Sequence, residues 1–386
     1  MNRRHSLFFA ALAALASCSG PPEATGPGPG SAEPHLATAP DGSVILSWLE
    51  PADGTTALRF SVLGENSWSE PRTIARGDNW FVNWADFPSV EAIDDSLWAA
   101  HWLVKAAEGT YEYDVAVSIS TDAGTTWGAP VTPHTDGILS EHGFVSLFPD
   151  RGGVGALWLD GRDMAHGMTL RSAVVMPDNS LNHDALADEL VCDCCQTDVA
   201  NGPQGPIAVY RNRTEDEIRD IYVTRMIHGE WETGRPVAHD GWEIAGCPVN
   251  GPAIAADGNN VAVAWVTAAN NDSIVKVSMS TDGGESFGVP IEIDPDQPVG
   301  RVDVVMLEDG ATHVTWLDQG EGGSGVIRAR KVSANGEPGD VETIATTSAG
   351  RMSGFPQAVR SGNRIVFAWT DVDGGTTRVK TAMNSL

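Results

Sequence analysis

Short apolar runs, alternating or continuous, are separated by Gly, Asp, Asn and Pro along almost the whole chain. Helical periodicity is nearly absent, so this pattern predicts an all-β fold. In the first repeat we expect strands at His35–Ala39, Val44–Leu49, Ala57–Val62 and from Trp68 to Ile74. Four strands in a unit of about 50 residues are typical of one blade of a β-propeller.

The second predicted strand of each unit ends in an aromatic residue, and these aromatics recur every 51 to 56 residues. A period this regular indicates a propeller or a solenoid. We therefore expect a β-propeller of four-stranded blades, with seven blades, or six if one unit is irregular. The seventh unit ends soon after its third strand, so the N-terminal region is expected to lend it an outer strand. The aromatics should pack between neighbouring blades: Trp48, Trp102, Trp158, Tyr210, Trp265, Trp316 and Trp369.

The N-terminus has a short basic segment and then an apolar run that is too short to span a bilayer, which indicates a cleaved export signal. The residues Leu15-Ala-Ser-Cys18 resemble the bacterial lipobox, which would make Cys18 a lipidated membrane anchor in the cell envelope. An ordinary signal peptide with a chance cysteine is the alternative. Ser19 after the cysteine favours the outer membrane, on either face. The predicted division is a signal peptide (1–17), a lipidated cysteine with a flexible Pro/Gly linker (18–34) and one propeller (35–386).

Two segments three repeats apart fit the pattern S-x-D-x-G-x-[ST]-[WF]. Each combines a tight turn, whose backbone the Ser and Asp side chains satisfy, with a Gly for the unusual dihedral and an aromatic plug. The residues are Ser120, Asp122, Gly124 and Trp127 in the first segment, and Ser280, Asp282, Gly284 and Phe287 in the second.

This pattern is similar to the Asp box of sialidases and other propellers with bacterial neuraminidase (BNR) repeats, and the resemblance extends over residues 35–386. It implies a sialidase-like propeller and raises the expectation of glycan chemistry. The Asp box itself is structural and lies away from the active site in such proteins. No Arg-Ile-Pro element of the sialidases occurs here, and Tyr210 occupies a core position. No catalytic residue of the family is therefore carried over.

One face of the predicted propeller carries the loops that enter the first strands and those that join the second strands to the third; we call it the mouth face. Functional residues concentrate on such loops. Arginines there would recognise carboxylate or sulfate, and tryptophans would stack on a sugar ring. The candidate ligand-binding residues are Trp80, Trp84, Arg162, Arg211, Arg213, Arg219, Asn250, Arg301 and Arg351. The candidate catalytic residues, for paired-carboxyl glycoside chemistry or a histidine base, are Asp86, Glu141, His142, Asp163, Glu217 and Asp303.

The formal net charge of −28 argues against binding to nucleic acid, and an anionic ligand would need the local arginines. Arg–Asp pairs that only cross-link loops are the structural alternative for any one of these residues.

Four cysteines remain besides Cys18. Cys192 precedes Tyr210 by 18 residues and Cys247 precedes Trp265 by 18, so they hold equivalent positions on the fourth and fifth blades and should lie close together. In an exported protein an even set indicates disulfides first, including a vicinal Cys194–Cys195 bridge. A copper or zinc site, or a redox-active thiol, is the alternative for Cys192, Cys194, Cys195 and Cys247.

Three functions stay open at this point. The first is an envelope-anchored propeller that binds a carbohydrate or an acidic small molecule at an Arg/Trp-rich mouth. The second is an exo-glycosidase of the sialidase superfamily, which needs two carboxyl groups beside one bond. The third is a metal or redox protein, which needs the four sulfurs to converge on one point.

Overall fold

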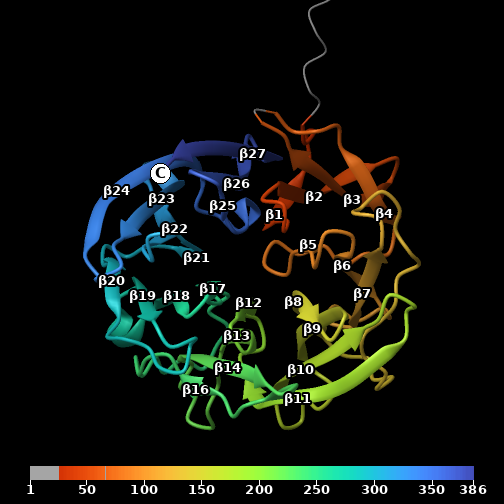
Figure 1. Ribbon diagram of the computed structural model, residues 1–386, viewed down its shortest axis with the longest axis horizontal. Helices are drawn as coiled ribbons and strands as arrows, with labels where there is room; N and C mark the ends of the chain where they lie inside the picture. Colours follow the sequence, from red (N-terminus) through yellow and green to blue (C-terminus); the bar gives the residue numbers. More distant parts are fainter. Residues whose placement is uncertain (1–25, 66) are drawn as a thin grey trace, which may run out of the picture.

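The computed structural model describes residues 26–65 and 67–386. The expected signal segment and Cys18 lie outside the described residues. Among these residues, seven small antiparallel sheets stand in a ring around a central axis (Figure 1), which confirms the all-β, seven-bladed prediction. No helix within the described part of the chain is long and apolar enough to span a bilayer.

Blades 1, 3, 5 and 6 each have four strands, and each strand pairs with the one that follows it in the chain. Blade 1 has β1 (Ala32–Thr38), β2 (Val44–Ala52), β3 (Thr55–Leu63) and β4 (Arg72–Gly77). Blade 3 has β8 (His142–Asp150), β9 (Gly153–Asp160), β10 (Met168–Val175) and β11 (Leu181–Val191). Blade 5 has β17 (Ala253–Asp257), β18 (Asn260–Thr267), β19 (Ile274–Ser280) and β20 (Ile291–Asp294), with the 3-10 helix η1 (Ala269–Asn271). Blade 6 has β21 (Gly300–Met306), β22 (Thr312–Gln319), β23 (Ser324–Val332) and β24 (Pro338–Ser348), with η2 (Glu321–Gly323).

The other three blades depart from four simple strands. Blade 4 has β12 (Asp198–Gly202), β13 (Gly205–Arg211) and β14 (Ile221–Ile227), and its outer strand is broken into β15 (Glu230–Trp231) and β16 (Arg235–Pro236). Blade 2 has β5 (Ser89–Ala92), β6 (Trp98–Lys105) and β7 (Tyr113–Ser120); its outer position is held by a two-hydrogen-bond bridge between Val117 and Val131. Blade 7 has β25 (Gln357–Ser361), β26 (Arg364–Asp373) and β27 (Thr376–Ser385), preceded by η3 (Arg351–Ser353).

The seven repeated aromatics each pack against the preceding blade. Trp48 of blade 1 contacts a cluster with Val366 and Ala368 of blade 7, and Trp369 of blade 7 lies in a cluster with Leu317 of blade 6. The other five aromatics follow the same rule, so seven apolar clusters correspond to seven interfaces between blades.

Three of these aromatics also donate a hydrogen bond to an acidic side chain of the preceding blade or of the loop that follows it. Trp316 Nε1 donates to Asp294 at 2.7 Å, Trp265 Nε1 to Asp240 at 2.7 Å and the Tyr210 hydroxyl to Asp188 at 2.5 Å. Buried indole N–H and phenol groups need such partners. These bonds join adjacent blades as well as satisfying the aromatic.

The ring closes where the first blade meets the last. Within the described residues blade 7 has three strands and receives no outer strand from the N-terminal region, contrary to expectation. As expected, β1 is the inner strand of blade 1, but it begins at Ala32, before the predicted boundary at residue 35. The segment before it is held on blade 7 by hydrogen bonds from Gly30 N–H to the Thr377 carbonyl (2.8 Å) and from Val379 N–H to Ser31 Oγ (2.9 Å). We call this junction between blades 1 and 7 the seam.

Both segments with the S-x-D-x-G pattern form the same turn. In the first, Asp122 Oδ1 accepts from Thr126 N–H at 2.8 Å, and Ser120 Oγ accepts from Gly124 N–H at 2.9 Å. The bonds of Asp282 and Ser280 match these at 2.9 and 3.0 Å. Gly124 and Gly284 both have positive φ, which explains the glycine. The aromatic of the first turn, Trp127, packs on Phe60 of blade 1 rather than between strands of its own blade.

Candidate functional site

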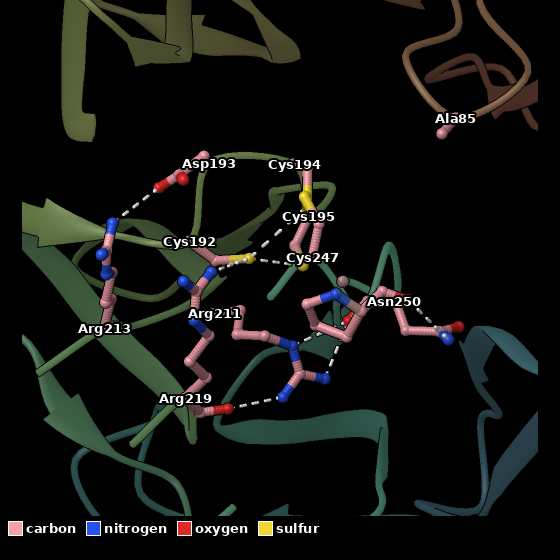
Figure 2. Close-up of a disulfide and its surroundings, with 12 residues drawn as sticks. Ala85, Cys192, Asp193, Cys194, Cys195, Arg211, Arg213, Arg219, Cys247 and Asn250 are labelled. Atoms are coloured by element: carbon pink, nitrogen blue, oxygen red, sulfur yellow. Dashed lines mark hydrogen bonds and ion pairs between the residues drawn. A yellow bond between two sulfur atoms is a disulfide. The ribbon is translucent and has the colours of Figure 1, made fainter. Parts of the chain in front are cut away.

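The four cysteines gather on the mouth face, on two neighbouring loops (Figure 2). Cys192, Cys194 and Cys195 lie between β11 and β12, and Cys247 lies between β16 and β17. Cys194 and Cys247 form a disulfide with a Cα–Cα distance of 6.0 Å. The equivalent loops of blades 4 and 5 therefore meet as expected, and the vicinal Cys194–Cys195 bridge does not form.

Cys192 and Cys195 are free and buried, and they lie against this disulfide. The Sγ of Cys192 is 2.8 Å from that of Cys195 and 4.0 Å from that of Cys194. Three sulfurs of one short loop thus lie within reach of a single point, with the fourth sulfur bonded to one of them.

Positive groups face Cys192. Arg219 Nη1 lies 3.4 Å from its Sγ, while Arg219 Nη2 donates to Glu217 at 2.9 Å. Burial raises the pKa of the Cys192 thiol, but hydrogen bonds from Cys195 and the nearby Arg211 and Arg219 lower it to about 7 overall. The pKa of Cys195 is instead raised well above its ordinary value, mainly by burial. One thiol of the pair is therefore set to ionise near neutral pH.

Arg211 holds the cysteine loops together from below. Its guanidinium donates to the backbone carbonyls of Asn250 (2.9 and 2.8 Å), Arg219 (2.6 Å) and Val266 (2.8 Å) and lies 4.7 Å above the Trp242 ring. The side chain is buried, so it binds the protein's own backbone rather than presenting a free fork to a ligand. Asn250 in turn accepts from Arg301 N–H at 2.8 Å.

Arg301 and Arg213 are also engaged within the protein, whereas Arg351 is exposed. Arg301 is buried and donates to Gly350, Ser353 and Gly354, and it lies 4.6 Å above the Trp84 ring. Arg213 pairs with Glu217 at 2.6 Å and Asp193 at 3.4 Å. Arg351 is exposed and lies close enough to lower the pKa of Arg301, whose burial is the larger cause.

The two predicted tryptophans are packed as well. Trp80 is buried on Trp102, with ring centroids 5.3 Å apart, and Trp84 stacks on Phe355 at 6.0 Å. Trp80 is therefore covered by protein, whereas Trp84 is half-buried and keeps part of its ring exposed to solvent.

The predicted carboxyl groups serve mainly to join blades. Asp86 is 3% exposed; its Oδ1 accepts from Phe144 N–H of blade 3 at 2.7 Å. The Tyr113 hydroxyl donates to Glu141 at 2.6 Å and also lies 3.2 Å from Asp86. Burial raises the pKa of Asp86 to about 8 and that of Glu141 to about 7. This phenol between two carboxyls lies inside the protein and is not presented to solvent as a catalytic pair.

Asp303 joins blades 6 and 7 as Asp86 joins blades 2 and 3. Its carboxylate accepts from Ala358 N–H of blade 7 at 2.6 Å and from Val304 N–H at 2.7 Å. Burial raises its pKa to about 8. Asp163, by contrast, is exposed and contacts only His166, at 2.8 Å.

His142 belongs to a cluster that the sequence did not reveal. It is the first residue of β8, and its ring stacks on that of His134 with centroids 3.8 Å apart. Arg162 lies beside the pair, bonded to Asp160 at 2.7 Å and Asp184 at 3.1 Å. His134 was not singled out because it lies after the turn motif of residues 120–127, where neither that motif nor the repeat marks it. The remaining members of the cluster are Asp114 and Asp136.

Comparison with known proteins gives information on the fold and none on the site. No family model and no curated protein matched the sequence. Among solved structures, a protein of unknown function from Dyadobacter fermentans is similar at 15% identity and a TM-score of 0.55, covering 93% of this chain and 95% of that one. The polysaccharide lyase Uly1 is similar at 10% identity and a TM-score of 0.51, covering 88% of each chain. The Hadza microbial sialidase Hz136 is similar at 13% identity and a TM-score of 0.48, covering 74% of this chain and 63% of that one.

At such identities these likenesses show the fold alone, which is that of a seven-bladed β-propeller.

Proposed function

We propose that the protein binds a soft metal ion, copper(I) or zinc, through its four cysteines at the mouth of the propeller. The observation that carries this is the convergence of Cys192, Cys194 and Cys195 from one loop with Cys247 from the next blade. In tetrahedral zinc thiolate sites with Zn–S distances of about 2.3 Å, neighbouring sulfurs lie roughly 3.8 Å apart. The Cys192–Cys194 separation of 4.0 Å fits that spacing, whereas Cys192 and Cys195, at 2.8 Å, and the bonded Cys194 and Cys247 would have to move apart to reach it.

The charges around the cysteines suit thiolates. Four thiolates around one ion leave a net negative charge, which Arg219 at 3.4 Å from Cys192 offsets. The bonds of Arg211 to three backbone carbonyls fix the two loops, so the sulfur donors are pre-arranged. Soft thiolate ligands select Cu(I) and Zn(II) over harder cations.

The reduced protein is the form that binds. Two electrons and two protons from an external dithiol convert the Cys194–Cys247 disulfide into two thiols, and the dithiol becomes a disulfide. Metal binding then releases the thiol protons. The cysteines thus link metal occupancy to the redox state of the surroundings.

The test is a metal titration of the reduced domain under anaerobic conditions, read by elemental analysis and by competition with a chromogenic chelator. We expect one Cu(I) per chain, or one Zn(II) more than the oxidised domain binds, and this ion should be lost in Cys192→Ser and in Cys195→Ser. Met352→Ala, an exposed change on the same face, should bind as the wild type does. Four titratable thiols without retained metal would overturn the proposal.

A glycan or acidic small molecule at the mouth is the second candidate. It is favoured by Arg351, which is exposed and close to Arg301, whose guanidinium lies over the Trp84 ring. Calorimetric titration with acidic oligosaccharides should then give heat that Arg351→Ala abolishes. Unchanged heat in that variant, or none in the wild type, would remove this candidate.

A further inference from the structure

A second cluster of metal-ligating side chains lies between blades 2 and 3. Asp114 comes from β7 and His142 opens β8. His134 and Asp136 come from the loop that replaces the outer strand of blade 2, and Asp160 ends β9. These five residues belong to different parts of the repeat, and only the missing strand allows the loop to bring His134 against His142.

The two imidazole rings lie face to face, 9° from parallel, and present two edges. At one edge, His134 Nδ1 and His142 Nε2 lie 3.3 and 3.4 Å from Asp136 Oδ2, and Arg162 Nη2 lies 3.4 Å from the same oxygen. At the other edge, His134 Nε2 and His142 Nδ1 lie 3.7 and 3.6 Å from Asp114 Oδ1. We call the second edge the Asp114 edge.

The nitrogens at the Asp114 edge have no hydrogen-bond partner. His142 is 0% exposed and His134 is 7% exposed, yet His134 Nε2 and both ring nitrogens of His142 are unsatisfied. A buried polar atom without a partner destabilises the folded protein, because the water it has lost is not replaced. Three such atoms in one cluster therefore indicate a missing binding partner.

The neighbouring charges decide which edge carries the ring protons. Asp136 Oδ2 lies 3.3 and 3.4 Å from one nitrogen of each ring, and Asp160 Oδ1 lies 3.8 Å from His142 Nε2, without a hydrogen bond to either ring. Two carboxylates at this edge favour placing the N–H groups of neutral rings there, which leaves the lone pairs on the side of Asp114. Two ring nitrogens and a carboxylate oxygen then lie together at the Asp114 edge without a donor between them. A cation would satisfy all three atoms, and because the rings are stacked one of them must tilt for both nitrogens to face the same ion.

We propose that Asp114, His134 and His142 bind a divalent first-row transition ion, with zinc the simplest occupant. Ligands about 2.1 Å from a tetrahedral ion stand roughly 3.4 Å apart, close to the 3.6 and 3.7 Å between Asp114 and the two nitrogens. Asp136 and Asp160 orient the rings from behind, as outer carboxylates do for metal-bound histidines. Asp114 is 35% exposed, so water reaches the remaining coordination positions.

This site is distinct from the cysteine cluster, because its ligand atoms are nitrogen and oxygen and it binds without reduction of the disulfide.

The experiment is a Co(II) titration monitored by absorption spectroscopy, together with a measurement of thermal stabilisation by Zn(II). We expect one equivalent of Co(II) with ligand-field bands but no thiolate-to-cobalt charge transfer. The same binding should persist in Cys192→Ser/Cys195→Ser, whether or not the cysteine proposal holds.

Two variants test the ligands. Asp114→Asn, which keeps the volume of a half-exposed side chain, and His134→Gln should each weaken Co(II) binding at least tenfold. Asp163→Asn, an exposed carboxylate outside the cluster, is the matched control and should bind as the wild type does. The proposal would be overturned if the wild type did not bind Co(II), or if Asp114→Asn and His134→Gln bound Co(II) with the affinity of the wild type. Thermal melts of each variant show whether it is folded.

Discussion

The guanidinium of Arg219 lies between the thiol of Cys192 and the carboxylate of Glu217, 3.4 Å from the sulfur and 2.9 Å from the oxygen. Glu217 also pairs with Arg213, so this carboxylate fixes two arginines beside the cysteines. In the sequence analysis Arg213 and Arg219 were candidate ligand-binding residues on the mouth face, and Glu217 was a candidate catalytic residue. Their geometry instead supports a role in setting the charge around a buried thiol.

Arg219→Gln should lower the affinity of the reduced protein for Cu(I) or Zn(II) by roughly tenfold, because side chains behind metal ligands contribute on that scale. Competition with a chromogenic chelator measures the change. Arg219→Lys keeps the charge but loses the paired contact with Glu217, so it should lie between the wild type and Arg219→Gln. Equal affinities in all three proteins would contradict the role assigned to this side chain.

Cys247→Ser removes the link between the loops of blades 4 and 5, which spans 53 residues. We expect it to lower the free energy of unfolding by about 2–4 kcal/mol, since the unfolded chain gains freedom. Denaturant titration without reductant measures the loss. Under the same conditions the wild-type domain without Cys18 should have two reactive thiols, Cys192 and Cys195, and the variant three. A wild-type count of zero would mean that these two cysteines are also bonded.

Trp316→Phe should be more destabilising than Trp369→Phe by about 1–2 kcal/mol. Both remove a buried indole at a blade interface, but only Trp316 Nε1 donates to an acid, and its loss leaves the buried Asp294 without that donor. Trp369 Nε1 has no partner to lose. Urea midpoints of the two variants give the difference. Equal losses would show that packing alone carries the interface.

Raising the pH should destabilise the fold through Asp303. Burial raises its pKa from 3.8 to about 8 in the folded protein, so between these values the folded state holds more protons than the unfolded state. The contribution of this group is therefore full below about pH 4 and is lost as the pH rises toward 8, at up to about 1.4 kcal/mol per pH unit. Asp303→Asn should flatten this part of the curve, measured as unfolding free energy from pH 5 to 8. A slope as steep as that of the wild type would assign the effect to other buried acids.

The blades could be predicted from the sequence because each unit repeats a local pattern. The spacing of aromatics such as Trp158 and Trp265 reports an interface that is the same at every step around the ring. The proximity of the cysteine loops followed from the same period, through the equal offsets of Cys192 and Cys247.

The details of the sites depend on non-repeating features. His134 meets His142 only because blade 2 lacks an outer strand, and no local pattern encodes that omission. Arg211 and Arg301 look like surface ligands in the sequence, yet both are buried clamps on backbone carbonyls. Whether an arginine faces solvent or its own backbone depends on loop conformation, which the alternation of apolar and polar residues does not specify.

The seam is the junction of the ring whose opening bears on the rate of unfolding. Six blade interfaces are also joined by continuous chain, but the seam between blades 1 and 7 is held by side-chain packing and by bonds such as Val379 N–H to Ser31 Oγ, 348 residues apart. Contacts of such sequence separation form late and slowly. Once they open, the ring becomes a linear array whose end blades have lost a neighbour. We therefore expect the lifetime of the folded ring to depend on how fast this one junction opens, separately from its equilibrium stability.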